Sequence, residues 1–296
     1  MSRSTPLPAA GRARGPRRRR AGLEAVLTYA GAVLLAAFIL APFVWLLISS
    51  IAPLADLLQR PLHWIPPHAT WERYRTIFFG ADGREFRFAL RNSAFVAGVA
   101  TSISLVAGML GAYALSRFPS RSRTGLLYLM LATYMTPPVA ILLPIYLILS
   151  RLGMLNTVIG LALVYTSFLT PFLTWILKGF FDSIPVELEE SAMIDGATRV
   201  GALRRVTLPL SLPGVITAVL FGVILAWDEF LYALIFTSSV AAKTLPVAIS
   251  EFTSRHAVDY GLMAAGGIVA ALPPLILAFA LQRYLIAGLT AGSVKG

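Results

Sequence analysis

Two adjacent acids, Asp228 and Glu229, are the acidic residues of this sequence that fall well inside a long apolar stretch. A charge in such a stretch is costly and usually faces a cavity or a partner group. Aromatic residues flank the pair, and this combination suits a polyhydroxylated ligand, because carboxylates accept hydrogen bonds from hydroxyl groups and rings cover C–H faces. The candidate ligand contacts are Trp227, Asp228, Glu229, Tyr232, Tyr134 and Tyr165.

Other interpretations of the acidic pair exist. The acids could satisfy backbone or partner-subunit groups at a helix kink, or they could lie near the outer membrane interface. They could also act as paired carboxylates in a membrane-embedded hydrolase. Adjacent residues on a helix point about 100° apart, so they do not easily flank one water molecule, and this disfavours the hydrolase. A metal or thiol enzyme is also disfavoured, because the sequence has no cysteine. Its three histidines fall in expected loops without metal-ligand spacing: His63, His68 and His256.

A second group of charges lies in the segment 183–209. Its residue types predict a short helix, a break at Gly196 and a second short helix. Pro185 suits the first turn, where its missing N–H is harmless, and three acids follow near the positive end of that helix. Asp195 or Thr198 can cap the second helix, and Pro209 is expected to end it. The three acids are Glu187, Glu189 and Glu190.

The composition indicates which elements position these groups. Of the 296 residues, 57% are hydrophobic and only 13% charged, about half the charged fraction of a soluble domain. Six apolar stretches are long enough for transmembrane helices, which need about 20 residues. They predict an all-α polytopic membrane protein. The stretches cover about 25–51, 90–115, 125–149, 155–177, 211–237 and 262–287.

The formal net charge of +11 resides mostly in the N-terminal tail. Seven arginines and no acid occur in the first 20 residues, and the rest of the chain carries 18 basic and 14 acidic residues. A nucleic-acid binder would instead spread its basic residues over a folded face. If the N-terminus is cytoplasmic, 16 Lys and Arg residues lie on that side and 9 on the other. The positive-inside rule therefore predicts that both termini lie in the cytoplasm. We expect the chain in the plasma (inner) membrane.

The run Glu190-Ser-Ala-Met-Ile-Asp-Gly-Ala197, followed 12 residues later by Pro209, resembles the EAA loop of ATP-binding-cassette (ABC) importer permeases. Further stretches resemble the second membrane subunit of maltose/trehalose-type sugar permeases, including Ala112-Tyr-Ala-Leu-Ser-Arg-Phe118 and Ala226-Trp-Asp-Glu-Phe230. The resemblance implies a six-helix type I importer permease whose EAA loop docks on an ATPase. We therefore call the segment 183–209 the coupling loop. The coupling residues would be Glu190, Ser191, Ala192, Asp195, Gly196, Ala197 and Pro209.

The resemblance also implies partners for the chain. These are a second homologous permease, an ABC ATPase dimer, an extracytoplasmic solute-binding protein, the lipid bilayer and a sugar such as a disaccharide, with no nucleic acid. The sequence contains no phosphate-binding loop, so no cofactor is expected in this chain, and ATP and Mg would be bound by the ATPase. The alternatives are an importer permease for a polyol, glycerol phosphate or polyamine, and a basic-tailed receptor or scaffold.

The expected organisation follows the stretches and the loop. It comprises a basic cytoplasmic tail (1–24), a first transmembrane helix (25–51), an extracytoplasmic loop (52–87), a permease core (88–287) that contains the coupling loop 183–209, and a cytoplasmic C-terminal tail (288–296).

Overall fold

The computed structural model describes residues 16–59, 64–81, 83–118, 121–252 and 259–291, and it contains no strand among them. Four helices in these ranges are long and apolar enough to cross a bilayer, and two bent helix pairs raise the number of spans to six if each pair is one span. The predicted all-α membrane fold is confirmed. The four long helices are α1 (Pro16–Ile51), α4 (Gly83–Arg117), α7 (Val158–Asp182) and α14 (Tyr260–Ala291).

The two bent pairs correspond to the third and fifth apolar stretches. Helix α5 (Arg123–Met135) meets α6 (Pro138–Arg151) at 91°, and the break falls at Thr136 and Pro137. The segment Arg199–Leu210 meets α11 (Leu212–Trp227) at 79°. The chain breaks after α11 and resumes as the short α12 (Leu231–Phe236). The stretch 125–149 is therefore divided at Thr136 and Pro137, and the stretch 211–237 is divided after Trp227, at the acidic pair.

Several predicted boundaries also shift. Helix α1 begins at Pro16, inside the segment expected as a tail, and α4 begins at Gly83 rather than near residue 88. The expected loop before α4 contains two short helices, α2 (Leu54–Leu58) and α3 (Glu72–Phe79). Helix α14 extends to Ala291, beyond the expected start of the C-terminal tail. Residues 1–15 and 292–296, His63 and His256 lie outside the described residues.

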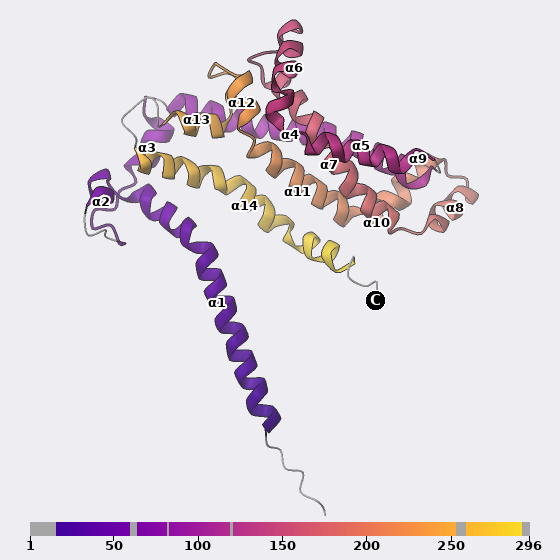
Figure 1. The fold of residues 1–296 in the computed structure, drawn as a ribbon, viewed down its shortest axis with the longest axis horizontal. Helices are drawn as coiled ribbons and strands as arrows, with labels where there is room; N and C mark the ends of the chain where they lie inside the picture. Colours follow the sequence, from indigo (N-terminus) through magenta and orange to yellow (C-terminus); the bar gives the residue numbers. More distant parts are fainter. Residues whose placement is uncertain (1–15, 60–63, 82, 119–120, 253–258, 292–296) are drawn as a thin grey trace, which may run out of the picture.

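The centre of the molecule is the pair α4 and α7, with α11 packed against both (Figure 1). Small residues let these helices approach closely. A Cβ added at Gly108 of α4 would lie 3.2 Å from the backbone nitrogen of Thr174 in α7. Leu173 and Leu177 of α7 are completely buried at this contact. The α4–α7 pair thus forms the frame that holds the coupling loop at one end.

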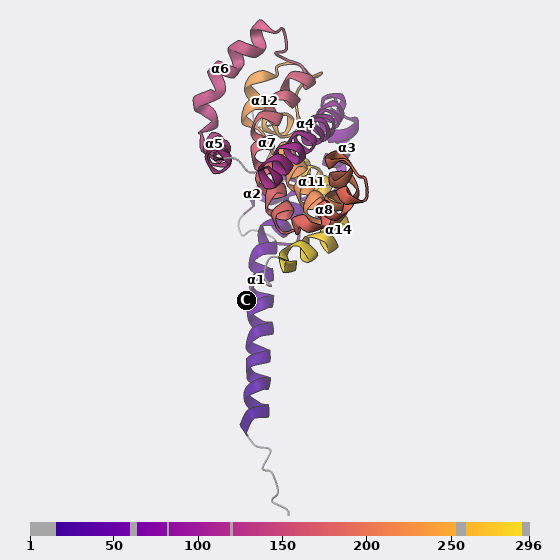
Figure 2. The same ribbon diagram turned by 90° about the vertical axis from the view of Figure 1, so that its right-hand side faces the viewer.

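Helix α1 extends away from this bundle (Figures 1 and 2). Its side chains from Glu24 to Val44 are exposed, and its last turns pack on α14 and α3. The buried Arg73 of α3 fixes this junction, since it donates a hydrogen bond to the carbonyl of Ser49 (3.1 Å) and pairs with Asp259 (3.3 Å). The apolar surface of α1 is therefore open to lipid or to another helix.

Candidate functional site

The coupling loop folds as two short helices around a glycine turn, as predicted. Helix α8 (Val186–Ile194) follows Pro185, and Gly196 has a φ of +93°, a conformation that favours glycine. The hydroxyl of Thr198 accepts a hydrogen bond from the N–H of Gly201 (3.1 Å), so Thr198 is the cap of α9 (Arg199–Ala202) rather than Asp195. The local chemistry alone explains this shape.

The second helical segment continues further than α9. It passes through a π-helical turn (Leu203–Thr207) into α10 (Leu208–Leu210), and the sharp bend follows at Ser211. Pro209 lies within the last turn, one residue before the end of the segment. The proline therefore marks the end of the loop to within one residue.

Glu189 anchors α8 to the end of α4. Its side chain is 3% exposed, and its Oε1 accepts a hydrogen bond from Nε of Arg117 (2.7 Å), whose own side chain is 4% exposed. Oε2 accepts from the hydroxyl of Tyr113 (2.8 Å), and Thr207 donates to Oε1. Arg117 also donates to the carbonyl of Ile184 (3.1 Å), at the start of the loop. One carboxylate thus joins α4, α8 and the π-helical turn.

The electrostatics of this cluster favour a charged Glu189. Burial alone raises the pKa of a carboxyl group, but the hydrogen bonds from Thr207, Arg117 and Tyr113 outweigh it and hold the pKa of Glu189 below its ordinary value. Removing one partner of such a buried ion pair strongly destabilises the fold, because the other charge is left buried without compensation. The cluster therefore fixes the orientation of the coupling loop relative to α4.

The residues expected to touch an ATPase lie on the outer side of the anchored loop. Glu190, Ser191, Asp195, Gly196 and Pro209 are exposed, and Ala192 and Ala197 are half-buried. Ile194 and Val200 add apolar surface, with 86% and 72% of each residue exposed. The loop thus presents a mixed polar and apolar surface next to a rigid base.

The anchoring role of Glu189 was not predicted. The sequence placed Glu187, Glu189 and Glu190 together near the start of α8, where each would interact with the positive helix end. Tyr113 and Arg117 occur in the stretch Ala112–Phe118, which carried part of the family resemblance. Their position on one helix face, four residues apart, is the signal that points to a shared partner.

The acidic pair divides into two different environments. Glu229 caps α12, since its carboxylate accepts hydrogen bonds from the backbone N–H of Tyr232 (2.8 Å) and Ala233 (3.2 Å) and from the hydroxyl of Tyr165 (2.5 Å). This is the kink interpretation. Asp228 is exposed, and no described residue donates a hydrogen bond to its carboxylate or pairs with it.

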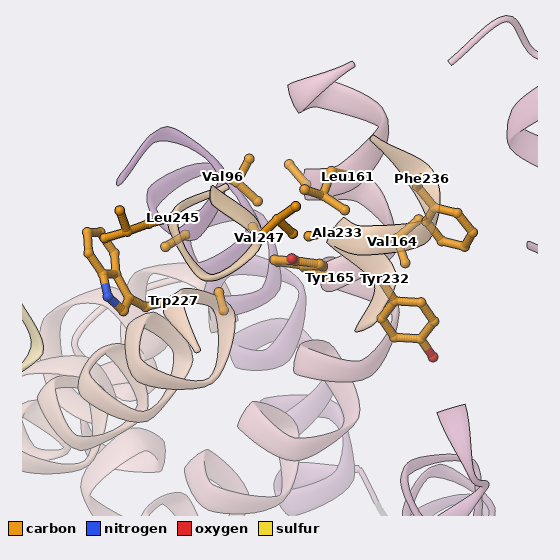
Figure 3. Close-up of a cluster of buried hydrophobic side chains, with 14 of the residues drawn as sticks. Val96, Leu161, Val164, Tyr165, Trp227, Tyr232, Ala233, Phe236, Leu245 and Val247 are labelled. Carbon is orange, nitrogen blue, oxygen red and sulfur yellow. The ribbon is translucent and has the colours of Figure 1, made fainter. Parts of the chain in front are cut away.

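The aromatic neighbours of the pair belong to the core. Trp227 is 5% exposed, and its indole N–H donates to the carbonyl of Ala270 (3.0 Å). Tyr232 is 4% exposed and Tyr165 is completely buried. Figure 3 shows Tyr165 in the middle of this cluster, with Trp227 on one side and Tyr232 and Phe236 on the other. These rings support the break after α11 and do not present faces to a ligand.

Tyr134 lies in a separate aromatic group, which we call the aromatic wall: Tyr134, Phe172, Trp175 and Phe221. Tyr134 of α5 stacks on Phe172 of α7, with centroids 5.4 Å apart. Trp175 and Phe221 contact the same Phe172. Tyr134, Trp175 and Phe221 are 39%, 49% and 42% exposed. Unlike the rings around Glu229, these rings offer surface to a ligand or a neighbouring subunit.

Metal binding has no support in the described part of the chain, where no group of three His, Asp or Glu residues could hold an ion. His68 lies 3.5 Å from Asp56 and is largely exposed. The described residues thus provide an anchored loop and exposed contact surfaces.

Comparisons with known proteins agree with this geometry. Residues 89–290 match the model of the family "Binding-protein-dependent transport system inner membrane component". The chain is 39% identical to the sulfoquinovosyl glycerol transport system permease SmoH of Agrobacterium fabrum, over 86% of this chain and 88% of that one. It is 37% identical to the trehalose transport system permease SugB of Mycobacterium tuberculosis, over 94% and 99% of the two chains.

The fold also has a match among solved structures. A chain of a bacterial ABC transporter involved in the import of the acidic polysaccharide alginate superposes with a TM-score of 0.74 at 20% identity, over 95% of this chain and all of that one. Together with the family match, this accounts for the helical architecture. The chain therefore belongs to the binding-protein-dependent transport system inner membrane components, a family of multi-pass membrane permeases that carry no catalytic activity themselves.

Proposed function

We propose that this chain is the permease subunit of an ATP-driven importer that moves a carbohydrate, such as a disaccharide, across the membrane by alternating access. The anchored coupling loop carries this proposal, because a loop tied to α4 by a buried ion pair can transmit a push from a cytoplasmic partner as a rigid body. Relatives named for trehalose and for trehalose/maltose transport support the substrate class.

The partner at the loop is an ABC ATPase dimer, which binds ATP and Mg. The exposed Glu190, Ser191 and Asp195 surround the glycine turn, and Ile194 provides an apolar contact beside them. This mixture suits a groove on a protein partner. ATP binding would draw two such loops together and open the transport path on the opposite face. The loop is then cytoplasmic, and both termini lie on the same side.

The remaining partners are matched to surfaces of this chain that are exposed. The exposed sides of α1 and of the aromatic wall suit contact with a second homologous permease or with lipid. An extracytoplasmic binding protein would deliver the sugar at the face opposite the coupling loop. Within the path, Asp228 and Tyr134 are the ligand contacts we propose, because their side chains are accessible, whereas Trp227, Glu229 and Tyr232 hold the frame behind them.

The test is transport by the assembled complex. The chain is co-purified with its ATPase and second permease, reconstituted in liposomes, and ATP hydrolysis is measured with binding protein over a panel of mono- and disaccharides, polyols, glycerol phosphate and polyamines. Stimulation by a sugar supports the proposal, and stimulation by a non-sugar solute alone would replace the substrate class. Failure to co-purify with any ATPase would refute it.

The coupling surface has its own test in the same complex. Glu190→Lys reverses an exposed charge without touching the buried anchor, so membrane insertion is expected to persist while hydrolysis is uncoupled from uptake. Glu72→Lys, the same substitution at an exposed position of α3 outside the coupling loop, is the control. Normal coupled transport by Glu190→Lys would contradict the docking role.

A further inference from the structure

Three arginines occupy one face of α4 at its beginning. Arg84, Arg87 and Arg91 follow the spacing of successive helix turns, and all three are exposed. The opposite face of the same turns carries Phe86 and Ala89, each 1% exposed. The arginines therefore form a cationic edge that points away from the core.

The charge of this edge is not compensated within the described chain. None of the three arginines forms an ion pair with a described carboxylate, and Glu85, in the same turns, takes part in an interaction of its own. The guanidinium of Arg84 lies over the ring of Phe88, 5.6 Å from its centre, and Arg87 donates a hydrogen bond to the carbonyl of Phe78. These contacts orient the two side chains and leave their positive charges in place.

The same helix face continues as an apolar stripe. One to four turns further along lie Phe95, Gly98, Ser102 and Val106, all exposed. The hydroxyl of Ser102 donates to the carbonyl of Gly98 (2.7 Å), so its polarity is satisfied within the helix. Phe95 and Val106 are 44% and 55% exposed. This face of α4 is therefore cationic in its first turns and apolar in the turns that follow.

The length of α4 sets the depth of the arginines. Its 35 residues span about 52 Å at 1.5 Å per residue, whereas a bilayer core is about 30 Å thick. The other end of α4 is fixed to the coupling loop through Arg117. If Arg117 lies on the coupling-loop side of the bilayer, the first turns of α4 reach the headgroup level on the opposite side, and the stripe from Phe95 to Val106 lies among acyl chains.

We propose that this face of α4 binds an anionic phospholipid in the leaflet opposite the coupling loop. Guanidinium groups pair with phosphate in a bidentate geometry, and several close together select an anionic headgroup over a zwitterionic one. The acyl chain packs along Phe95, Gly98 and Val106. An acidic protein surface would match the arginines alone, whereas a phospholipid matches both the arginines and the stripe.

The experiment measures lipid retained by the complete transporter. The complex is placed in nanodiscs that contain phosphatidylglycerol and phosphatidylcholine in equal amounts, and the retained lipids are counted by native mass spectrometry. The test variant changes Arg84, Arg87 and Arg91 to Gln. The matched control changes three other exposed arginines to Gln: Arg121, Arg151 and Arg283.

We expect the wild type and the control to retain more phosphatidylglycerol than phosphatidylcholine. In the test variant, the ratio of the two retained lipids should fall about tenfold. Equal preference in all three proteins would overturn the proposal. So would unchanged lipid retention combined with weaker capture of the binding protein or the second permease by the test variant, since the occupant would then be a protein. Lipid counting needs neither hydrolysis nor transport, so this result does not depend on which solute the transporter carries.

Discussion

The guanidinium of Arg117 lies 2.7 Å from the carboxylate of Glu189, and both side chains are almost completely buried. The two residues are separated by 72 positions in the sequence and belong to different helices. Their pairing makes the coupling loop an extension of α4, so a displacement of one must move the other.

Glu189→Ala should loosen the coupling loop. The substitution leaves Arg117 buried without its partner, which typically costs about 3–5 kcal/mol. The chain has no cysteine, so spin labels can be attached at Leu188→Cys and Arg121→Cys and their distance measured by electron paramagnetic resonance. We expect a narrow distance distribution in the labelled parent and a broad one in Glu189→Ala.

Glu190→Ala is the control for this measurement, because it removes a neighbouring carboxylate that is exposed. Its distance distribution should match that of the parent. Equal widths in the Glu189→Ala and Glu190→Ala proteins would show that the buried pair does not hold the loop.

The contribution of Glu189 to stability should depend on pH only in the acid range. Because the pKa of Glu189 is held below its ordinary value of 4.5, its ionised form is the one that the folded state favours. The stabilisation is complete above that ordinary value and is lost as the pH falls through the lower folded value. The difference in unfolding midpoint between wild type and Glu189→Gln should stay constant near neutral pH.

Below pH 4.5 the difference should shrink, because the wild-type carboxyl group becomes protonated. Thermal unfolding of the two proteins in detergent, recorded across this range, measures it directly. A difference that shrinks instead between neutral and alkaline pH would assign the titration to another group.

Gly196→Ala should disturb coupling through the backbone alone. The φ of Gly196 is +93°, and a Cβ at this position meets nothing within 4 Å, so the substitution causes no collision. The strain of placing an L-residue there is roughly 1–2 kcal/mol, enough to shift the turn between α8 and α9. We expect assembly to persist and the ratio of sugar transported to ATP hydrolysed to fall.

Gly179→Ala serves as the comparison, because Gly179 also has open space around its Cβ position but lies within the helix α7. This variant should retain normal coupling. If both alanine variants transport normally, the glycine conformation is not required for coupling.

The shape of the coupling loop was predictable from sequence because it depends on local chemistry. Proline before the first helix, glycine at the turn and a Thr198 cap act within a few residues of their own positions. The role of Glu189 was not predictable in the same way. Three acids near the start of α8 are locally equivalent, and only the packing of α8 against α4 decides which one meets Arg117.

The same reason explains the acidic pair. Asp228 and Glu229 are adjacent and chemically alike, and apolar content predicts a continuous helix through them. In the structure, α11 ends at Trp227, and the Glu229 carboxylate accepts hydrogen bonds from free N–H groups of α12, whereas Asp228 is exposed. Hydrophobicity predicts where the membrane spans lie, whereas the position of a break in a helix depends on which tertiary hydrogen-bond partners are available.

These two acids should respond differently to neutralisation. Glu229→Gln removes the charge that satisfies two backbone N–H groups and the Tyr165 hydroxyl, so it should lower the unfolding midpoint. A hydrogen bond to a charged group contributes about 1.5–3 kcal/mol.

Asp228→Asn removes an exposed carboxylate without such contacts. It should leave the unfolding midpoint unchanged and raise the KM for sugar uptake, because an amide accepts hydroxyl hydrogen bonds less strongly than a carboxylate. Uptake assays in liposomes and thermal unfolding of the same preparations separate the two effects. Unchanged uptake kinetics in Asp228→Asn would remove this residue from the substrate path, and an unchanged midpoint in Glu229→Gln would remove Glu229 as the cap of α12.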